Sequence, residues 1–465
     1  MVVVCLLTFG VSRYQQRQED IKTSGETILE IPADSVQAVS WDNETQSLAF
    51  HKDDKWIYDE DEAFPVDGEK MEEMLGLFSD FGAAFIIESP EDLSQYGLEN
   101  PVCTIELETE EESYTILLGN YSNMDSQRYV SIGDGNVYLV AEDPLDTFDA
   151  ELEDMVDNDD LPQFDQVSQI DFSGTDVEAY QITKQEENTS DTYREEDVYF
   201  TQQGEKTEPL DTDKVEDYLY TISNLDLTDY VSYNATQEEI ADCGLDDPDL
   251  TVQVAYTQED EDGQTTEETF VLHVSRDPEE KAKAESEEKK AESSSQDEEE
   301  EEEEITAYAR VGDSQILYNL DSDSYQALME ASYDDLRHSE VLPADLEQIS
   351  QVDIQLEDAD YTITAEGKDE DRTYHYGEEE LESEDFPNAL SALSADSFTD
   401  EEPGDKLEIG LTLHLDTEEE TSIQVDLYRY DGTNCLAVVD GEPVCLVARS
   451  SVMDLVEAVN AIVLN

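Results

Sequence analysis

Positive charge is scarce in this chain of 465 residues, where 23 Lys and Arg stand against 123 Asp and Glu and give a formal net charge of −100. A phosphate backbone repels such a surface, so the composition argues against nucleic-acid binding. It also argues against docking onto anionic lipids, which requires basic patches. The sequence therefore predicts no nucleic-acid partner.

Cysteine pairs at metal-binding or redox spacing are lacking as well. None of the five cysteines forms a C-x-x-C pair, which excludes zinc-ribbon and thioredoxin-type motifs. Cys435 and Cys445 flank the turn Asp440-Gly441, and two strands around this turn would allow a disulfide between them. Two buried free thiols are the alternative.

Signatures of catalysis are missing too. There is no G-x-S-x-G, P-loop or G-x-G-x-x-G motif. The five histidines are dispersed, and no two of them lie at metal-ligand spacing. The stretch Asp260–Gly263 is similar to part of an EF-hand loop, but Gln258 and Thr269 occupy the first and twelfth positions, where Asp and Glu are needed. We therefore predict a non-enzymatic chain without catalytic residues, metal ligands or cofactors.

The N-terminus has one short apolar run, Val2–Val11, which is followed by Arg13, Arg17 and Lys22. A helix of this length reaches about 15 Å, whereas spanning a membrane takes about 20 residues. We interpret residues 1–25 as the back half of a signal anchor, and a disordered or buried tail is the alternative. Basic residues after the run would by themselves favour a cytoplasmic body.

A mean hydropathy of −0.62 combined with high charge is typical of disordered chains. However, 24 Tyr and 13 Phe are more than such chains carry, and many segments alternate apolar and polar residues as strands do. We therefore predict folded domains with acidic surfaces. The low-complexity run Asp277–Glu304 is the exception, and we predict that it is disordered.

An internal repeat is the strongest signal in the sequence. The order β-meander, helix, β-meander, helix occurs three times, in residues 26–160, 161–340 and, more divergently, 341–465. Helical spacing of apolar residues predicts the first helix of each unit, at Gly68–Phe81, Thr212–Leu225 and Phe386–Leu393. We predict an α+β fold of three concatenated repeat units, each of mainly antiparallel β-meanders with packed helices.

The acidic run 277–304 falls inside the second unit, between the second and third strands of its second meander. Unit one has only a short loop at that place. We therefore interpret the run as a disordered loop insert rather than as a linker between domains, since the entropy of loop closure grows slowly with length.

Two short elements begin the second meanders of units one and two, and they share Gly, Leu and Pro. The glycines permit positive φ, and each proline restricts the residue before it. Both leucines would then point into the core. A structural role is our interpretation, with a binding loop as the alternative. The residues concerned are Tyr96, Gly97, Leu98 and Pro101 in unit one, and Gly244, Leu245 and Pro248 in unit two.

Together with Leu118-Gly119, Arg128-Tyr129-Val130 and the strand Val137–Val140, the first of these elements resembles the bacterial family catalogued as domain of unknown function 4340 (DUF4340). Unit one is the most similar, unit two is similar through Gly244–Pro248, and unit three only weakly. The resemblance implies one N-terminal membrane anchor and a body outside the cytoplasm. It also implies ABC transporter subunits as partners, and it implies no catalytic residue.

These observations favour a membrane-anchored, extracytoplasmic interaction module, an accessory of an ABC-transporter-type envelope complex. One alternative is an acidic cell-surface protein that binds divalent cations or wall polymer. A hydrolase is a third possibility, which a deep pocket with convergent carboxylates would favour.

The charge imbalance makes a direct prediction. Repulsion between carboxylates destabilises the compact state, and salt screens it. Raising sodium chloride from about 0.01 M to about 0.5 M, at which the Debye length falls to a few ångströms, should raise the melting temperature. Chloride is preferred to sulfate because sulfate also stabilises proteins by exclusion from their surface. A melting temperature that stays constant or falls would contradict the prediction.

Overall fold

The computed structural model describes residues 26–186, 191–259, 263–291, 305–356, 359–367, 372–416 and 421–463. The predicted anchor, residues 1–25, lies outside this set. In the part of the chain that the structure describes, no helix combines the length and the apolar character needed to cross a bilayer.

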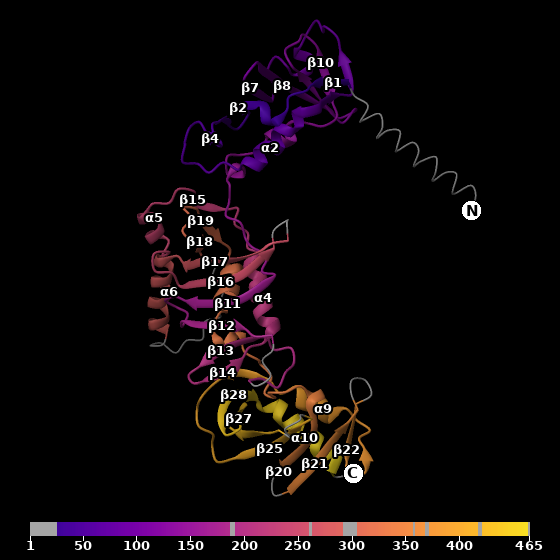
Figure 1. Ribbon diagram of the computed structural model, residues 1–465, viewed down its shortest axis with the longest axis vertical. Helices are drawn as coiled ribbons and strands as arrows, with labels where there is room; N and C mark the ends of the chain where they lie inside the picture. The colour runs from indigo at the N-terminus through magenta and orange to yellow at the C-terminus, as the bar shows by residue number, and fades with distance from the viewer. Residues whose placement is uncertain are drawn as a thin grey trace, which may run out of the picture. The chain divides into compact units, whose positions relative to one another are not determined.

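Three large antiparallel sheets with one common strand order form the fold (Figure 1). The first has the order β4-β3-β2-β7-β8-β9-β10-β6, from β2 Val36–Asn43, β3 Ser47–Lys52, β4 Trp56–Tyr58, β6 Phe85–Ile87, β7 Cys103–Thr109, β8 Ser113–Ser122, β9 Gln127–Ser131 and β10 Val137–Val140. A separate pair joins β1 Glu26–Leu29 and β5 Phe81–Ala83.

The second sheet has the order β14-β13-β12-β11-β16-β17-β18-β19-β15, from β11 Gln166–Ser173, β12 Tyr180–Lys184, β13 Tyr199–Gln203, β14 Lys206–Pro209, β15 Tyr230–Ser232, β16 Leu250–Glu259, β17 Thr265–Arg276, β18 Ala307–Val311 and β19 Leu317–Leu320. The third has the order β23-β22-β21-β20-β25-β26-β27-β28-β24, from β20 Ile349–Leu356, β21 Ala359–Glu366, β22 Thr373–Tyr376, β23 Glu379–Glu380, β24 Ala395–Phe398, β25 Leu407–Leu415, β26 Ser422–Arg429, β27 Asn434–Val439 and β28 Glu442–Ala448. The predicted α+β fold of three repeat units is confirmed.

Helices occur at the same two positions in the chain order of each repeat. The helix between the two meanders is α2 Gly68–Gly76, α4 Thr212–Ser223 or α9 Asp385–Ser391. The helices after the second meander are α3 Leu145–Phe148 in the first repeat, α7 Ser322–Met329 and α8 Tyr333–Leu336 in the second, and α10 Arg449–Val463 in the third. Asp67 and Asp211 cap the N-termini of α2 and α4 through hydrogen bonds to their side chains.

The opening strand of each repeat contains the same β-bulge. The register slips between Val36 and Ala38, between Val167 and Gln169, and between Ile349 and Gln351. In all three strands the first two core residues are three positions apart. Regular alternation would place two residues at this spacing on opposite faces of the strand. The extra residue of the bulge returns both to the buried face.

A short strand that follows the middle helix forms the far edge of each sheet. It pairs with the last strand of the second meander, in the pairs β6–β10, β15–β19 and β24–β28. The periodicity did not predict these strands, because segments of three or four residues are too short to show alternation.

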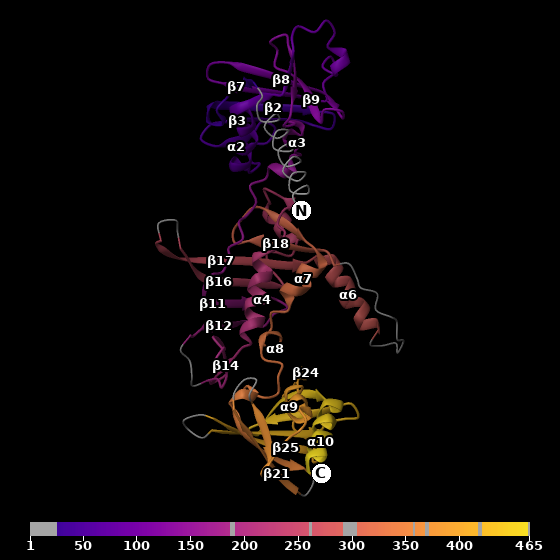
Figure 2. The same cartoon turned by 90° about the vertical axis from the view of Figure 1, so that its right-hand side faces the viewer.

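Aromatic residues join sheet to helix in the cores of the first two repeats. Trp41 of β2 stacks on Phe50, with ring centroids 5.3 Å apart, and meets Phe148 of α3 edge-on at 5.6 Å. Phe172 of β11 contacts Tyr218 of α4 edge-on at 5.5 Å. In the third repeat, whose helices α9 and α10 are seen in Figure 2, the core contains the helical residues Leu390, Val452 and Leu455. Phe386 of α9 also meets Tyr374 of β22 edge-on at 6.4 Å.

By contact density the chain divides into two compact units. One contains residues up to 160 together with 226–246 and 308–320, and the other contains 161–225, 247–307 and 321–465. In the first unit, the ring of Tyr233 lies 5.0 Å from that of Phe64, and its hydroxyl donates a hydrogen bond to Asp61 at 2.7 Å.

The prediction of a disordered insert needs a correction. Pro278–Ala291 forms a helix, α6, between β17 and β18, and residues 292–304 lie outside the described set. Asp277 caps it by accepting hydrogen bonds from the backbone N–H groups of Glu279 and Glu280. Lys281 extends from its first turn to Asp249, at 2.5 Å. Glu, Lys and Ala are strong helix formers, so low complexity here does not mean disorder.

Candidate functional site

The Gly-Leu element of the first repeat is a tight turn packed on β8. Gly97 has φ of +75° and ends a 3-10 turn, and the next residue, Leu98, is buried. A side chain at Gly119 of β8 would clash with the backbone oxygen of Tyr96. Pro101 leads towards β7, and just before that strand the N–H of Val102 donates to the carbonyl of Leu118 at 2.8 Å.

Arg128 extends this cluster from β9. It is buried, and it donates to the carbonyl oxygen of Gly119 at 2.7 Å and to the carboxylate of Asp143 at 2.5 Å. The next residue, Tyr129, places its ring 5.0 Å from that of Tyr96. The elements that carry the family resemblance therefore meet in space and hold one another in place.

The second repeat builds a reduced version of the same cluster. Gly244 has φ of +72°, and Leu245 and Cys243 are buried in a small core with Leu317. The strand register that follows is also shared: Leu250 pairs with Val274 as Cys103 pairs with Leu118.

That register places Ser275 in the position of Gly119. Its hydroxyl accepts a hydrogen bond from the N–H of Asp249, the residue after Pro248, at 3.1 Å. In the second repeat a serine therefore takes the place of this glycine. Gly119 makes room for the turn in the first repeat, whereas Ser275 forms a hydrogen bond just after the corresponding turn in the second.

Cys435 and Cys445 are both free and buried. Cys435 of β27 pairs with Val447 of β28, and Cys445 pairs with Ala437. The two cysteines therefore occupy diagonal positions rather than directly opposite ones, and the structure has the two buried thiols that were the alternative to a disulfide.

A groove of about 520 Å³ lies on the first repeat, beside α2 and α3. Half of its lining residues are Asp or Glu, and the lining also contains Thr147 and Lys70 but none of the Ser, Cys or His residues of a catalytic triad. Its lining residues are Lys70, Glu73, Met74, Leu77, Glu142, Asp146, Thr147, Asp149, Ala150 and Asp154.

The clearest grouping of chemically versatile side chains lies where the second repeat meets the third. We call residues 336–345 the junction segment. Arg194 holds it from the second repeat, with its guanidinium donating to the carbonyl oxygen of Leu342 and to the carboxylate of Asp345, both at 2.9 Å. From the third repeat, the N–H of Ala395 donates to the carbonyl oxygen of Ser339 at 2.7 Å.

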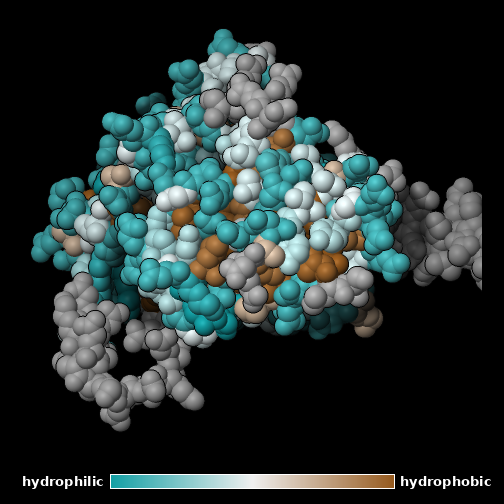
Figure 3. All heavy atoms as spheres, turned by 90° about the horizontal axis from the view of Figure 1, so that it is seen from below, coloured by the Kyte–Doolittle hydropathy of each residue, from teal (hydrophilic) through white to brown (hydrophobic). Residues whose placement is uncertain are grey.

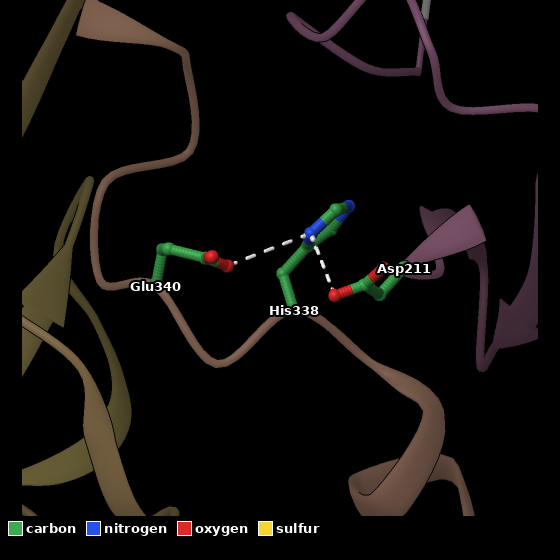
Figure 4. A group of neighbouring side chains, drawn as sticks. All are labelled: Asp211, His338 and Glu340. Carbon is green, nitrogen blue, oxygen red and sulfur yellow. Dashed lines mark ion pairs between the residues drawn. The ribbon is translucent and has the colours of Figure 1, made fainter. Parts of the chain in front are cut away.

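His338 occupies the centre of the junction segment. Its Nε2 lies 2.9 Å from Oδ1 of Asp197, a carboxylate whose side chain is only 1% exposed. Figure 4 shows its Nδ1 facing two further carboxylates, with Asp211 Oδ2 at 3.8 Å and Glu340 Oε2 at 3.7 Å. Neither distance is a hydrogen bond.

The carboxylates set the charge of this group. Burial lowers the pKa of His338, but the hydrogen bond to Asp197 and the proximity of Glu340 outweigh burial and raise the pKa to about 9. The contact with His338 in turn lowers the pKa of Glu340 to about 2. The arrangement therefore favours a positive charge between the carboxylates, which a proton or a cation can supply.

Sequence reasoning missed this group. Asp197 and His338 are 141 positions apart, so their pairing is visible only in the fold. The one local signal is His338-Ser339-Glu340, because side chains two positions apart in extended backbone share a face.

Comparison with protein families matches the chain twice with the model described as domain of unknown function (DUF4340), at residues 56–248 and 209–412. The chain belongs to this family. Comparison with curated proteins and with solved structures found no match.

The DUF4340 matches are offset from the structural repeats. They begin at β4 and at the end of β14, and they end just before β16 and within β25. Each match therefore covers the larger part of one repeat and continues into the next.

The turn around Gly97 predicts a steric effect at Gly119. Gly119→Ala should destabilise this DUF4340 protein by about 1–3 kcal/mol in urea unfolding, because the new methyl group meets backbone that cannot move aside easily. Gly76→Ala is the control. A methyl group at position 76 of α2 would meet no other atom within 4 Å, and alanine stabilises a helix by up to about 1 kcal/mol relative to glycine. Equal effects of the two changes would show that the close approach at Gly119 is not a constraint.

The buried thiols of the DUF4340 chain predict an alkylation pattern. Burial raises the pKa of Cys103 to about 12 and that of Cys445 to about 11, so neither should react in the native state near pH 8. In denaturant without reductant, Cys103, Cys435 and Cys445 should all become alkylated, as mass spectrometry of peptides would show. Labelling of Cys435 and Cys445 only after reduction would reveal a disulfide instead.

Proposed function

We propose that this DUF4340 protein is a non-enzymatic interaction module of the cell envelope. Its body lies outside the cytoplasm, its N-terminal segment anchors it to the cell membrane, and it serves as an accessory of an ABC-transporter-type complex. The anchor and the transporter partner follow from the family resemblance. The docking role is supported by an apolar strip on the first repeat.

The apolar strip consists of Phe85, Tyr129 and Tyr96, with the largely buried Leu139 between the first two. Phe85 of β6 pairs with Leu139 of β10, which pairs with Tyr129 of β9, so the three side chains lie on one face. The ring of Tyr96 rests against that of Tyr129. Phe85 is 61% exposed, and β6 is the edge strand of its sheet.

Exposed apolar residues are frequent in the first repeat. Among the described residues, eight large hydrophobic side chains are exposed, and half of them lie between positions 85 and 124 of the first repeat: Phe85, Leu93, Tyr121 and Met124. Figure 3 views the molecule from below relative to Figure 1. On that face hydrophilic residues dominate the surface, and hydrophobic residues gather in patches. Exposed aromatic groups with a hydrophilic surround are typical of protein interfaces, where they become desolvated anchors.

The charge of the chain restricts its partner. Like charges placed against each other oppose association, so a surface that docks on this protein should be neutral or basic around an apolar centre. The lack of recognised catalytic motifs supports a binding role over an enzymatic one.

Site-specific photocrosslinking in the native cells tests the proposal. A benzoylphenylalanine at position 85 should crosslink to transporter subunits, which mass spectrometry would identify. The control places the same group at Tyr220, an aromatic position that is 68% exposed on α4. Equal crosslinking from both positions, or crosslinks from position 85 to abundant proteins only, would contradict docking through the strip.

A further inference from the structure

We propose that Asp211, His338 and Glu340 bind a divalent transition-metal ion of the zinc class, which fastens the junction segment to the N-terminus of α4. This inference goes beyond the proposed docking function and uses different residues. It rests on the geometry of the three side chains and on the buried carboxylate behind the histidine.

The ligand atoms are already grouped around one point. His338 Nδ1, Asp211 Oδ2 and Glu340 Oε2 all lie within 4.8 Å of one another (Figure 4). In a tetrahedral zinc site with bonds of about 2.1 Å, the ligand atoms are about 3.4 Å apart. The observed distances of 3.7 and 3.8 Å need only a small contraction, and they are too long for direct hydrogen bonds.

Asp197 supplies the second and independent feature. Metal-binding histidines almost always donate their other ring N–H to a carboxylate or carbonyl, which fixes the tautomer and the ring orientation. Asp197 is placed to accept such a hydrogen bond from Nε2 of His338 at 2.9 Å, and Thr192 in turn donates to the other oxygen of Asp197 at 2.5 Å. Because Nε2 is thereby occupied, Nδ1 is the nitrogen directed at Asp211 and Glu340.

The two carboxylate ligands are held by elements of the fold. One oxygen of Asp211 accepts hydrogen bonds from the N–H groups of Asp213 and Lys214, as N-cap of α4, which leaves Oδ2 for the ion. Glu340 forms an isolated β-bridge with Ser394 of the third repeat. A bound ion would therefore link α4, the junction segment and the third repeat.

The donor set indicates the class of ion. One imidazole nitrogen and two carboxylate oxygens suit zinc and its neighbours, whereas calcium takes six to eight oxygen ligands. Three protein ligands leave a fourth position for water. A protonated His338 forming ion pairs with the same carboxylates is the competing state, and the experiment must separate the two.

Calorimetric titration of tag-free, chelator-treated full-length protein with zinc chloride tests the site. The titration is run near pH 8, because metal must displace the proton from Nδ1, and in salt with millimolar calcium to saturate non-specific carboxylates. We expect one zinc per chain. Binding should be abolished in His338→Gln and weakened about 10- to 100-fold in Asp197→Asn, which removes the supporting carboxylate.

His414→Gln is the matched control. His414 also pairs with a carboxylate, that of Asp353 at 2.7 Å, but it belongs to no three-ligand group among the described residues. This variant should bind zinc like the wild type. Zinc should also raise the melting temperature of the wild type and of His414→Gln, but not that of His338→Gln. If the wild type binds no stoichiometric zinc, or if the two histidine variants behave alike, His338 carries a proton only and the proposal is wrong.

Discussion

Each repeat depends on the antiparallel pairing between the first strand of its first meander and the first strand of its second. The three pairs are β2–β7, β11–β16 and β20–β25. A meander and a helix separate the partners in sequence, so forming the pair closes a long loop, and burial must offset that entropy. The shared bulge makes this burial complete, because it turns the first two core residues of the opening strand to the same face.

Sequence patterns revealed what is local and periodic. Alternation identified the meanders, and the spacing of Val215, Leu219 and Ile222 is that of a helix with one buried face. The edge strands are too short for any pattern, and the bulge was visible only as an irregular apolar spacing. The grouping of His338 with Asp197 and Asp211 was beyond prediction, because only tertiary structure brings such distant positions together.

The few basic side chains of the chain donate hydrogen bonds to specific acceptors. Arg128 donates to the carbonyl of Gly119, Arg194 to that of Leu342, and Arg372 to that of Leu346 at 2.7 Å. Surface ion pairs contribute little and can be exchanged, especially among so many carboxylates. A guanidinium that donates to a particular carbonyl in a partly buried place is more selective, since its planar donors need a fixed geometry. Scarce positive charge therefore holds turns and the junction segment.

Carboxylates and basic side chains meet around the junction segment. Asp197, Asp211 and Glu340 face the imidazole of His338, and Arg194 pairs with Glu340 and Asp345. Lys214 adds a further positive charge, since its Nζ donates to the carbonyl oxygen of Arg337 at 2.9 Å. At Nδ1 of His338, the proposed divalent ion would form directed bonds to Asp211 and Glu340, whereas a proton on that nitrogen would leave both carboxylates beyond hydrogen-bond distance. The proposed docking surface on the first repeat uses other residues, so we expect loss of the proposed ion to loosen the junction segment without removing the apolar strip.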